Sequence, residues 1–87
     1  MLRITIHNEA TTTRFIVEGK LAGPSVEELK TCWHRVASAG LPLLVDLSAT
    51  TLIDSEGKTL LAEMHRYGVQ LSAVGLMTQA IIEEITR

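Results

Sequence analysis

Cysteines, basic clusters and long apolar runs are scarce in this sequence, and each scarcity excludes a class of protein. Cys32 is the single cysteine among 87 residues, which rules out a disulfide within the chain and a metal site built on paired cysteines. The formal net charge is −2 and no run of lysines or arginines occurs, so the electrostatic signature of a nucleic-acid-binding protein is missing. No apolar run approaches the ~20 residues that cross a bilayer. We therefore expect a cytoplasmic protein that neither binds nucleic acid directly nor inserts into a membrane.

Aromatic residues are also few, with one Phe, one Trp and one Tyr. The core must therefore be built mainly from aliphatic side chains. Hydrophobic residues make up 46% of the chain, which is typical of a folded protein. A chain of 87 residues is long enough for one core, so residues 1–87 are predicted to form a single domain.

The first third of the chain has the pattern of a β-hairpin. Apolar and polar residues alternate from residue 2 to residue 7, which predicts a strand with one buried face. A turn at Asn8–Ala10 leads to a second alternating segment, Thr12–Glu18, and the two strands should pair. The glycines and proline of Gly19–Pro24 predict a loop after them.

A helix is predicted from Ser25 to Ala39, ended by Gly40. Ser25 and Glu28 have the spacing of a capping box, in which each side chain accepts the other residue's backbone N–H. Apolar residues recur on one face of this helix: Val26, Leu29, Trp33, Val36 and Ala37.

The rest of the chain alternates strands with helices. Leu43–Val45 is an apolar run that favours a central strand covered on both faces and ending at Asp46–Ser48. A helix over Ser55–Tyr67, a strand over Val69–Val74 and a last helix from Thr78 to Arg87 should follow. The second helix should bury Leu60, Leu61, Met64 and Tyr67, and the third should bury Ile81, Ile82 and Ile85. The order ββαβαβα predicts an α/β fold, a mixed four-stranded sheet with the first two helices packed on one face.

The residues that open the second helix carry the functional information. Asp54 has the position of an N-cap that accepts the backbone N–H of Glu56 or Gly57, and Ser55 follows it as the first, exposed helical residue. Glycine in a helix costs about 1 kcal/mol relative to alanine, so Gly57 indicates that something approaches the backbone closely. Asp and Ser are also ordinary helix-start residues, and a purely structural role stays open.

This segment resembles the STAS domain of anti-sigma-factor antagonists, which also occurs in the cytoplasmic parts of some anion transporters. The family pattern is a strand ending in Asp-Leu, then an apolar residue followed by Asp-Ser-x-Gly, and this chain has Asp46-Leu47, Ile53 and Asp54-Ser55-Glu56-Gly57 in that order. The resemblance implies that Ser55 is phosphorylated and that the partner is an anti-sigma factor with serine-kinase activity. The residues implied to contact this partner are Asp54, Ser55, Glu56, Gly57 and Ala22.

Two functions are consistent with this resemblance. One is an interaction switch controlled by phosphorylation of Ser55, and the other is a constitutive binding subunit of a transporter or stress-sensing complex. No nucleophile and base can be paired, so we expect no enzymatic activity. His7, His34 and His65 lie on separate predicted elements, so we expect neither a metal site nor a cofactor. The sequence leaves a homodimer open.

Overall fold

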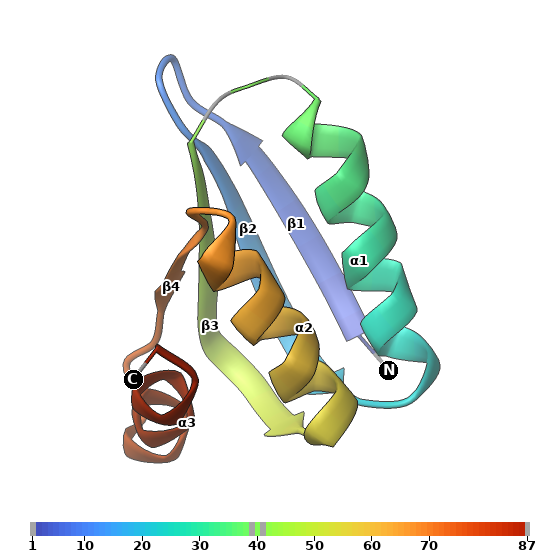
Figure 1. The fold of residues 1–87 in the computed structure, drawn as a ribbon, viewed down its shortest axis with the longest axis vertical. Coiled ribbons are helices and arrows are strands. Elements are labelled where there is room, and N and C mark those ends of the chain that lie inside the picture. Colours follow the sequence, from blue (N-terminus) through green and yellow to red (C-terminus); the bar gives the residue numbers. More distant parts are fainter. Residues whose placement is uncertain (1, 39, 41, 87) are drawn as a thin grey trace.

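The order of elements is ββαβαβα, as the hydrophobic pattern predicts (Figure 1). The computed structural model describes residues 2–38, 40 and 42–86. The expected ends of the first and last helices, Ala39 and Arg87, lie outside the described residues. The elements are β1 (Leu2–Asn8), β2 (Thr13–Leu21), α1 (Pro24–Ala37), β3 (Leu43–Ile53), α2 (Ser55–Arg66), β4 (Gln70–Ser72) and α3 (Leu76–Thr86).

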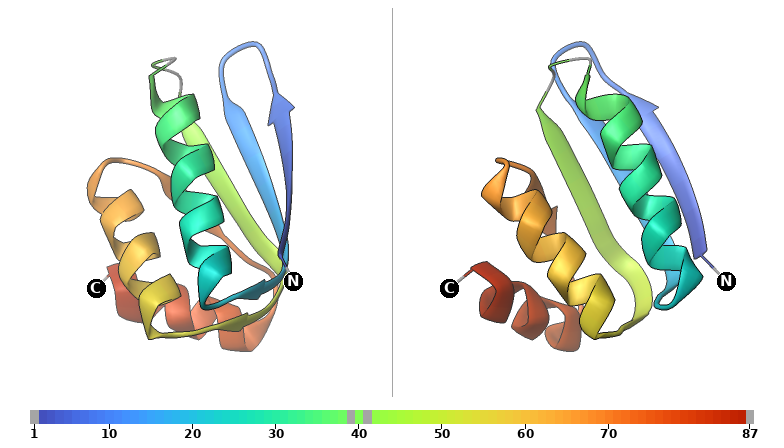
Figure 2. Two further views of the ribbon diagram at one scale, coloured as in Figure 1. Left: turned by 90° about the vertical axis from the view of Figure 1, so that its right-hand side faces the viewer. Right: turned by 45° about the vertical axis from the view of Figure 1, so that its right-hand side comes forward.

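The four strands form one mixed sheet in the order β1-β2-β3-β4. The hairpin partners β1 and β2 are antiparallel, whereas β2 with β3 and β3 with β4 are parallel. Each parallel connection is made by a helix, and α1 and α2 lie side by side on the same face of the sheet (Figure 2). The predicted mixed sheet with two helices on one face is therefore confirmed.

The core lies between this face of the sheet and the two helices. Phe15 and Val17 point into it from β2, while Leu29 of α1 and Leu61 of α2 meet them, and all four side chains are fully buried. Tyr67 was expected in the buried stripe of α2, but its side chain is 75% exposed. It caps the end of α2, where its ring meets Trp33 edge-on with ring centroids 5.7 Å apart.

Strand β3 is longer than predicted because two irregularities interrupt its alternation. The expected end at Asp46–Ser48 is wrong, since the strand continues to Ile53. Its pairing with β2 shifts register twice, between the partners of Ile16 and Glu18 and again between those of Gly19 and Lys20. Each shift places an extra residue on β3, so buried positions are spaced by three rather than two beyond residue 47.

The first helix begins earlier than its expected capping box. Pro24 is the first helical residue and Gly23 is the N-cap, so Ser25 is already inside α1 and makes no capping hydrogen bond. The predicted loop Gly19–Pro24 is also shorter, because β2 extends to Leu21. Only Ala22 and Gly23 remain between strand and helix, which brings the end of β2 close to the start of α1.

The edge of the sheet at β4 is short and is covered by the last helix, α3. Strand β4 has only three residues, and α3 packs against α2, β3 and β4 with its isoleucines partly buried. The expected burial of Ile81, Ile82 and Ile85 is thus met in part. The helices α1 and α2 cover one face of β3, so Leu44, which points to the opposite face, is only half-buried. The expectation of a central strand covered on both faces is therefore met in part.

Candidate protein-binding site at the start of α2

Asp54 ties the start of α2 to the loop before α1. It is the N-cap of α2, and its Oδ1 accepts the backbone N–H of Gly57 at 2.7 Å. Its Oδ2 accepts the backbone N–H of Gly23 at 3.0 Å, across 31 residues of sequence. The backbone N–H of Asp54 in turn donates to the carbonyl oxygen of Leu21 at 3.2 Å. Through its carboxylate and its backbone N–H, Asp54 therefore holds the ends of β2 and β3 and the starts of both helices together.

These hydrogen bonds also set the charge of the site. The backbone N–H groups of Gly57 and Gly23 stabilise the carboxylate and lower the pKa of Asp54 below its ordinary value of 3.8. Asp54 is therefore ionised at neutral pH. Because both carboxylate oxygens already accept hydrogen bonds from the chain, its first role is to shape the surface rather than to bind a partner directly.

Gly57 is explained by contacts within the domain. It is buried, and a Cβ added to it would lie 2.7 Å from the carbonyl oxygen of Leu21 and 3.0 Å from Cγ2 of Ile53. The close approach that glycine permits is thus made by the chain's own β2, not by a partner. A larger residue such as leucine would therefore disturb the fold itself, because no side chain fits there.

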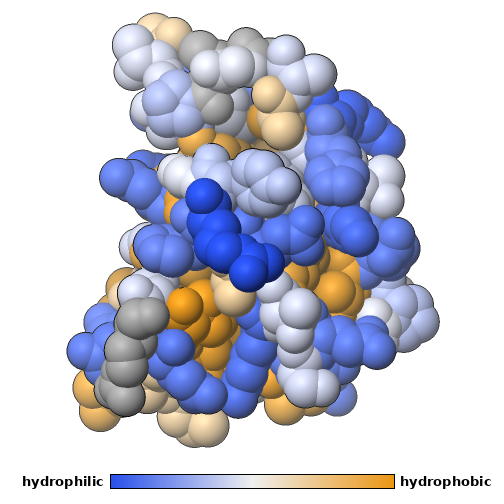
Figure 3. Space-filling view, viewed as in Figure 1, coloured by the Kyte–Doolittle hydropathy of each residue, from blue (hydrophilic) through white to orange (hydrophobic). Residues whose placement is uncertain are grey.

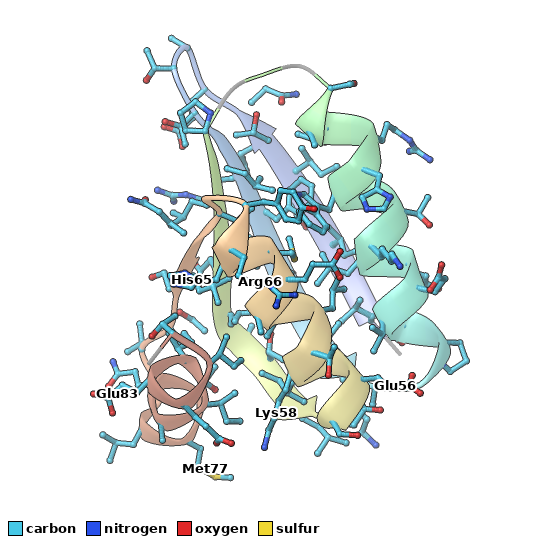
Figure 4. All side chains as sticks on the ribbon, in the orientation of Figure 1. Glu56, Lys58, His65, Arg66, Met77 and Glu83 are labelled. Atoms are coloured by element: carbon cyan, nitrogen blue, oxygen red, sulfur yellow. The ribbon has the colours of Figure 1, made fainter. Side chains whose placement is uncertain are left out.

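Ser55 and Glu56 form the exposed part of the site. Ser55 is the first residue of α2, and both side chains face solvent. Figure 4 shows Glu56 at the end of α2 where the helix begins, with Lys58 on the same turn and Met77 beyond it. The Ser55 hydroxyl is therefore presented on a rigid backbone, fixed by the Asp54 cap one residue earlier.

An apolar hollow adjoins this helix start. It has a volume of about 260 Å³ and lies between the end of β3, the first turns of α2 and the start of α3. Its rim includes Leu52, which is 49% exposed, and Met77, which is 82% exposed. Apolar surface is also visible between α2 and α3 in Figure 3. Exposed apolar side chains gathered beside polar ones are typical of a protein-binding surface.

The residues predicted to bind a partner come together at one end of the sheet. Ala22 is half-buried in the short loop that Asp54 holds, Ser55 and Glu56 are exposed, and Gly57 lies beneath them. Sequence reasoning missed Gly23, whose φ of 58° and N–H to Asp54 shape the loop. The Gly23-Pro24 pair is a turn signal that points to it. It also missed Leu52 and Met77, because nothing in the sequence separates an exposed apolar residue from a buried one.

The structure is similar to that of an anti-sigma factor antagonist from Mycobacterium paratuberculosis, with a TM-score of 0.84 and 20% sequence identity over 97% of this chain and 77% of that one. The fold is that of a STAS domain. A second solved structure, Mglu, matches with a TM-score of 0.66 and 16% identity over 82% of this chain and 19% of its own length. No family model and no curated protein matches the sequence.

Clusters of metal-binding side chains and membrane-spanning helices are both absent from the described residues. Among residues 2–38, 40 and 42–86, no three His, Cys, Asp or Glu side chains come together as a metal site would require. Within the same residues, no helix is both long enough and apolar enough to span a bilayer.

Proposed function

We propose that this STAS domain is an anti-sigma-factor antagonist of the bacterial cytoplasm, which binds an anti-sigma factor with serine-kinase activity through the start of α2. Phosphorylation of Ser55 then ends the binding. The observation that carries the proposal is the exposed Ser55 hydroxyl on a helix start that Asp54 fixes in place. The likeness to a known anti-sigma factor antagonist supports a binding module rather than an enzyme.

The neighbouring surface suits a protein partner. Leu52 and Met77 offer apolar contact area in a hollow that reaches the first turn of α2 at Lys58, so an apolar side chain of the partner has a hollow to fill. Ser55 and Glu56 add exposed polar groups at the start of α2, and Figure 4 shows Glu56 on the other side of Lys58 from Met77. An interface built in this way combines a desolvated apolar centre with a polar rim, as stable protein interfaces do.

Phosphorylation of Ser55 should act on the partner rather than on the fold. A phosphoserine carries about −1.5 to −2 charges at pH 7, and at a helix N-terminus this charge gains roughly 0.3–1 kcal/mol. Asp54 and Glu56 flank the phosphate and offset part of that gain by repulsion. The folded state is therefore little affected, whereas a docked partner would have to desolvate the added charge.

The experiment compares Ser55→Asp with Ser55→Ala for binding to the serine-kinase anti-sigma factors of the same organism, measured by calorimetry. We expect the aspartate variant to bind at least about tenfold more weakly, a difference of roughly 1.4 kcal/mol, with nearly equal melting temperatures. Ser38→Asp is the matched control, because it adds the same charge at the opposite end of the helical layer, beyond the end of α1. Its affinity should stay that of the unmodified protein.

Glu56 favours a second function, a constitutive binding subunit of a transporter or stress-sensing complex. An interface that already accommodates the exposed carboxylate of Glu56 would tolerate another charge at Ser55. Equal binding by the two folded Ser55 variants would reject the switch and support constitutive docking. Co-purification with a transporter ATPase in place of a kinase would point the same way.

A further inference from the structure

The outer edge of β1 is unpaired along its whole length. Only β2 pairs with β1 among the described residues, and β1 forms the margin of the sheet (Figure 2, right). The backbone N–H and C=O groups along this margin are a template for one more strand. Natural sheets cover such edges or shorten them, whereas this edge strand has seven residues, Leu2–Asn8.

A groove runs beside this edge, between β1 and α1. It has a volume of about 490 Å³ and is lined by Ile4 of β1 and by Glu28, Thr31 and Cys32 of α1, among others. Further along the strand, Ile6 points to the same side and is 41% exposed. The edge therefore presents apolar side chains on its helix side together with unpaired backbone groups.

The side of α1 toward the groove is acidic where Glu27 and Glu28 line it, and basic further along the helix at Arg35. Glu28 and Arg35 are exposed and seven residues apart, so they lie on the same face, nearly two helical turns from each other. The midpoint between them falls at Thr31 and Cys32. Ile4 lies against the turn that contains Glu28 and Cys32, so this midpoint is level with the middle of β1, close to Thr5.

We propose that a second copy of this chain covers the edge, its β1 pairing antiparallel with β1 about a two-fold axis near Thr5. Such an axis pairs Ile4 of each copy with Ile6 of the other. It also sets the two α1 helices antiparallel beside each other, so that Glu28 of each copy faces Arg35 of the other. The surface is thus complementary to itself, which is what a two-fold interface requires.

This charge pattern is the reason for choosing a second copy rather than a foreign peptide. A foreign segment could bind with a charged side chain that faces only one of the two residues Glu28 and Arg35. Its binding would therefore not require an acidic and a basic residue placed symmetrically about the middle of the edge. Here the Glu28 and Arg35 positions are symmetric about the centre of the edge. The dimer leaves Ser55 and Glu56 free, because they open α2, and in the right-hand view of Figure 2 α1 lies between α2 and the outer edge of β1.

The test is the oligomeric state of the full chain, measured by sedimentation from about 1 to about 500 μM, over which mass action should convert monomer to dimer. We expect the mass to double with concentration. Glu28→Arg alone and Arg35→Glu alone should each weaken the dimer at least about tenfold, because like charges then face each other in both pairs. Circular dichroism checks that each variant is folded.

Mixing the two single variants provides the decisive measurement. A heterodimer of Glu28→Arg with Arg35→Glu restores opposite charges in both pairs, so an equimolar mixture should dimerise as the unmodified chain does. The double variant with both changes should do so too. Ile6→Lys, which places a charge in the paired edge, should give a folded monomer.

A chain that stays monomeric at every concentration would overturn the proposal and leave the edge to an extended segment of another protein. A dimer whose affinity is the same in the unmodified chain, both single variants and their mixture would place the contact elsewhere and overturn it as well.

Discussion

The substitution Gly57→Ala distinguishes two interpretations of Gly57 that the sequence alone cannot separate. Either the position is an ordinary helical residue, where alanine is preferred, or it makes a close contact that only glycine permits. In an open helix, alanine would stabilise this position by about 0.8–1 kcal/mol relative to glycine. In this structure the added Cβ would lie 2.7 Å from the carbonyl oxygen of Leu21, a backbone atom that no side-chain rotation can move away. The two effects have opposite signs, so the measured stability decides between them.

The contact should dominate. Overpacking of a well-packed site costs typically about 1–3 kcal/mol. The carbonyl of Leu21 also accepts the N–H of Asp54, so moving it loosens a further hydrogen bond that contributes about 0.5–1.5 kcal/mol. After the helical preference is subtracted, we expect Gly57→Ala to lower the free energy of unfolding by about 1–3 kcal/mol. In a domain of this size, each kcal/mol lowers Tm by roughly 4–8 °C.

Thermal and urea unfolding of Gly57→Ala and Gly75→Ala measure this difference. Gly75 is a fair control because nothing lies within 4 Å of the Cβ that would be added there. Its substitution should change stability by less than about 0.5 kcal/mol. If Gly57→Ala were as stable as the unmodified protein, or more stable, the close approach of α2 to β2 would be refuted.

Two other predictions concern hydrogen bonds that join distant parts of the chain. Asp54→Asn should lower Tm at neutral pH because it removes the charge that the N–H groups of Gly57 and Gly23 stabilise. The folded pKa of Asp54 is lowered, so its contribution is present above the unfolded value and lost as pH falls through the folded value. The Tm difference between the two proteins should therefore begin to shrink as pH falls below 3.8 and disappear once pH is below the lowered folded pKa. A difference that did not shrink in acid would contradict the assignment. Thr50→Val removes the buried hydrogen bond from Thr50 Oγ1 to the carbonyl oxygen of Val17 and should destabilise the fold by about 1–3 kcal/mol in urea titrations, while Thr51→Val, on the exposed side, should be neutral.

Much of the fold was predictable because its signals are local. The hairpin follows from alternation over a few residues, and the buried stripes of α1 and α2 follow from a period of 3.6. The Asp54 cap of α2 was predicted for the same reason, since the cap and the N–H of Gly57 are three residues apart. This chain and the anti-sigma factor antagonist of similar structure share only 20% sequence identity. The short Asp-Ser-x-Gly pattern, placed between a strand and a helix, nevertheless predicted the same fold.

The predictions that were wrong share one cause: residues distant in the sequence decided the local structure. Strand β3 was cut short because two register shifts against β2 break its alternation, and a register exists only once two strands have paired. The capping box of Ser25 did not form because Gly23, held by Asp54, starts the helix earlier. Tyr67 has the period of a buried residue but lies at the end of α2, beyond the core.

The sequence by itself determined which segments form strands and helices, which faces they bury, and that a serine opens the second helix. Those properties depend on side chains within one or two turns of each other. Only the tertiary structure decided that Gly57 makes room for Leu21, that Asp54 joins two loops, and that β1 is left as an open edge. Each of these depends on the approach of backbone segments far apart in the chain, and their positions are set by the packing of the whole sheet and its helices.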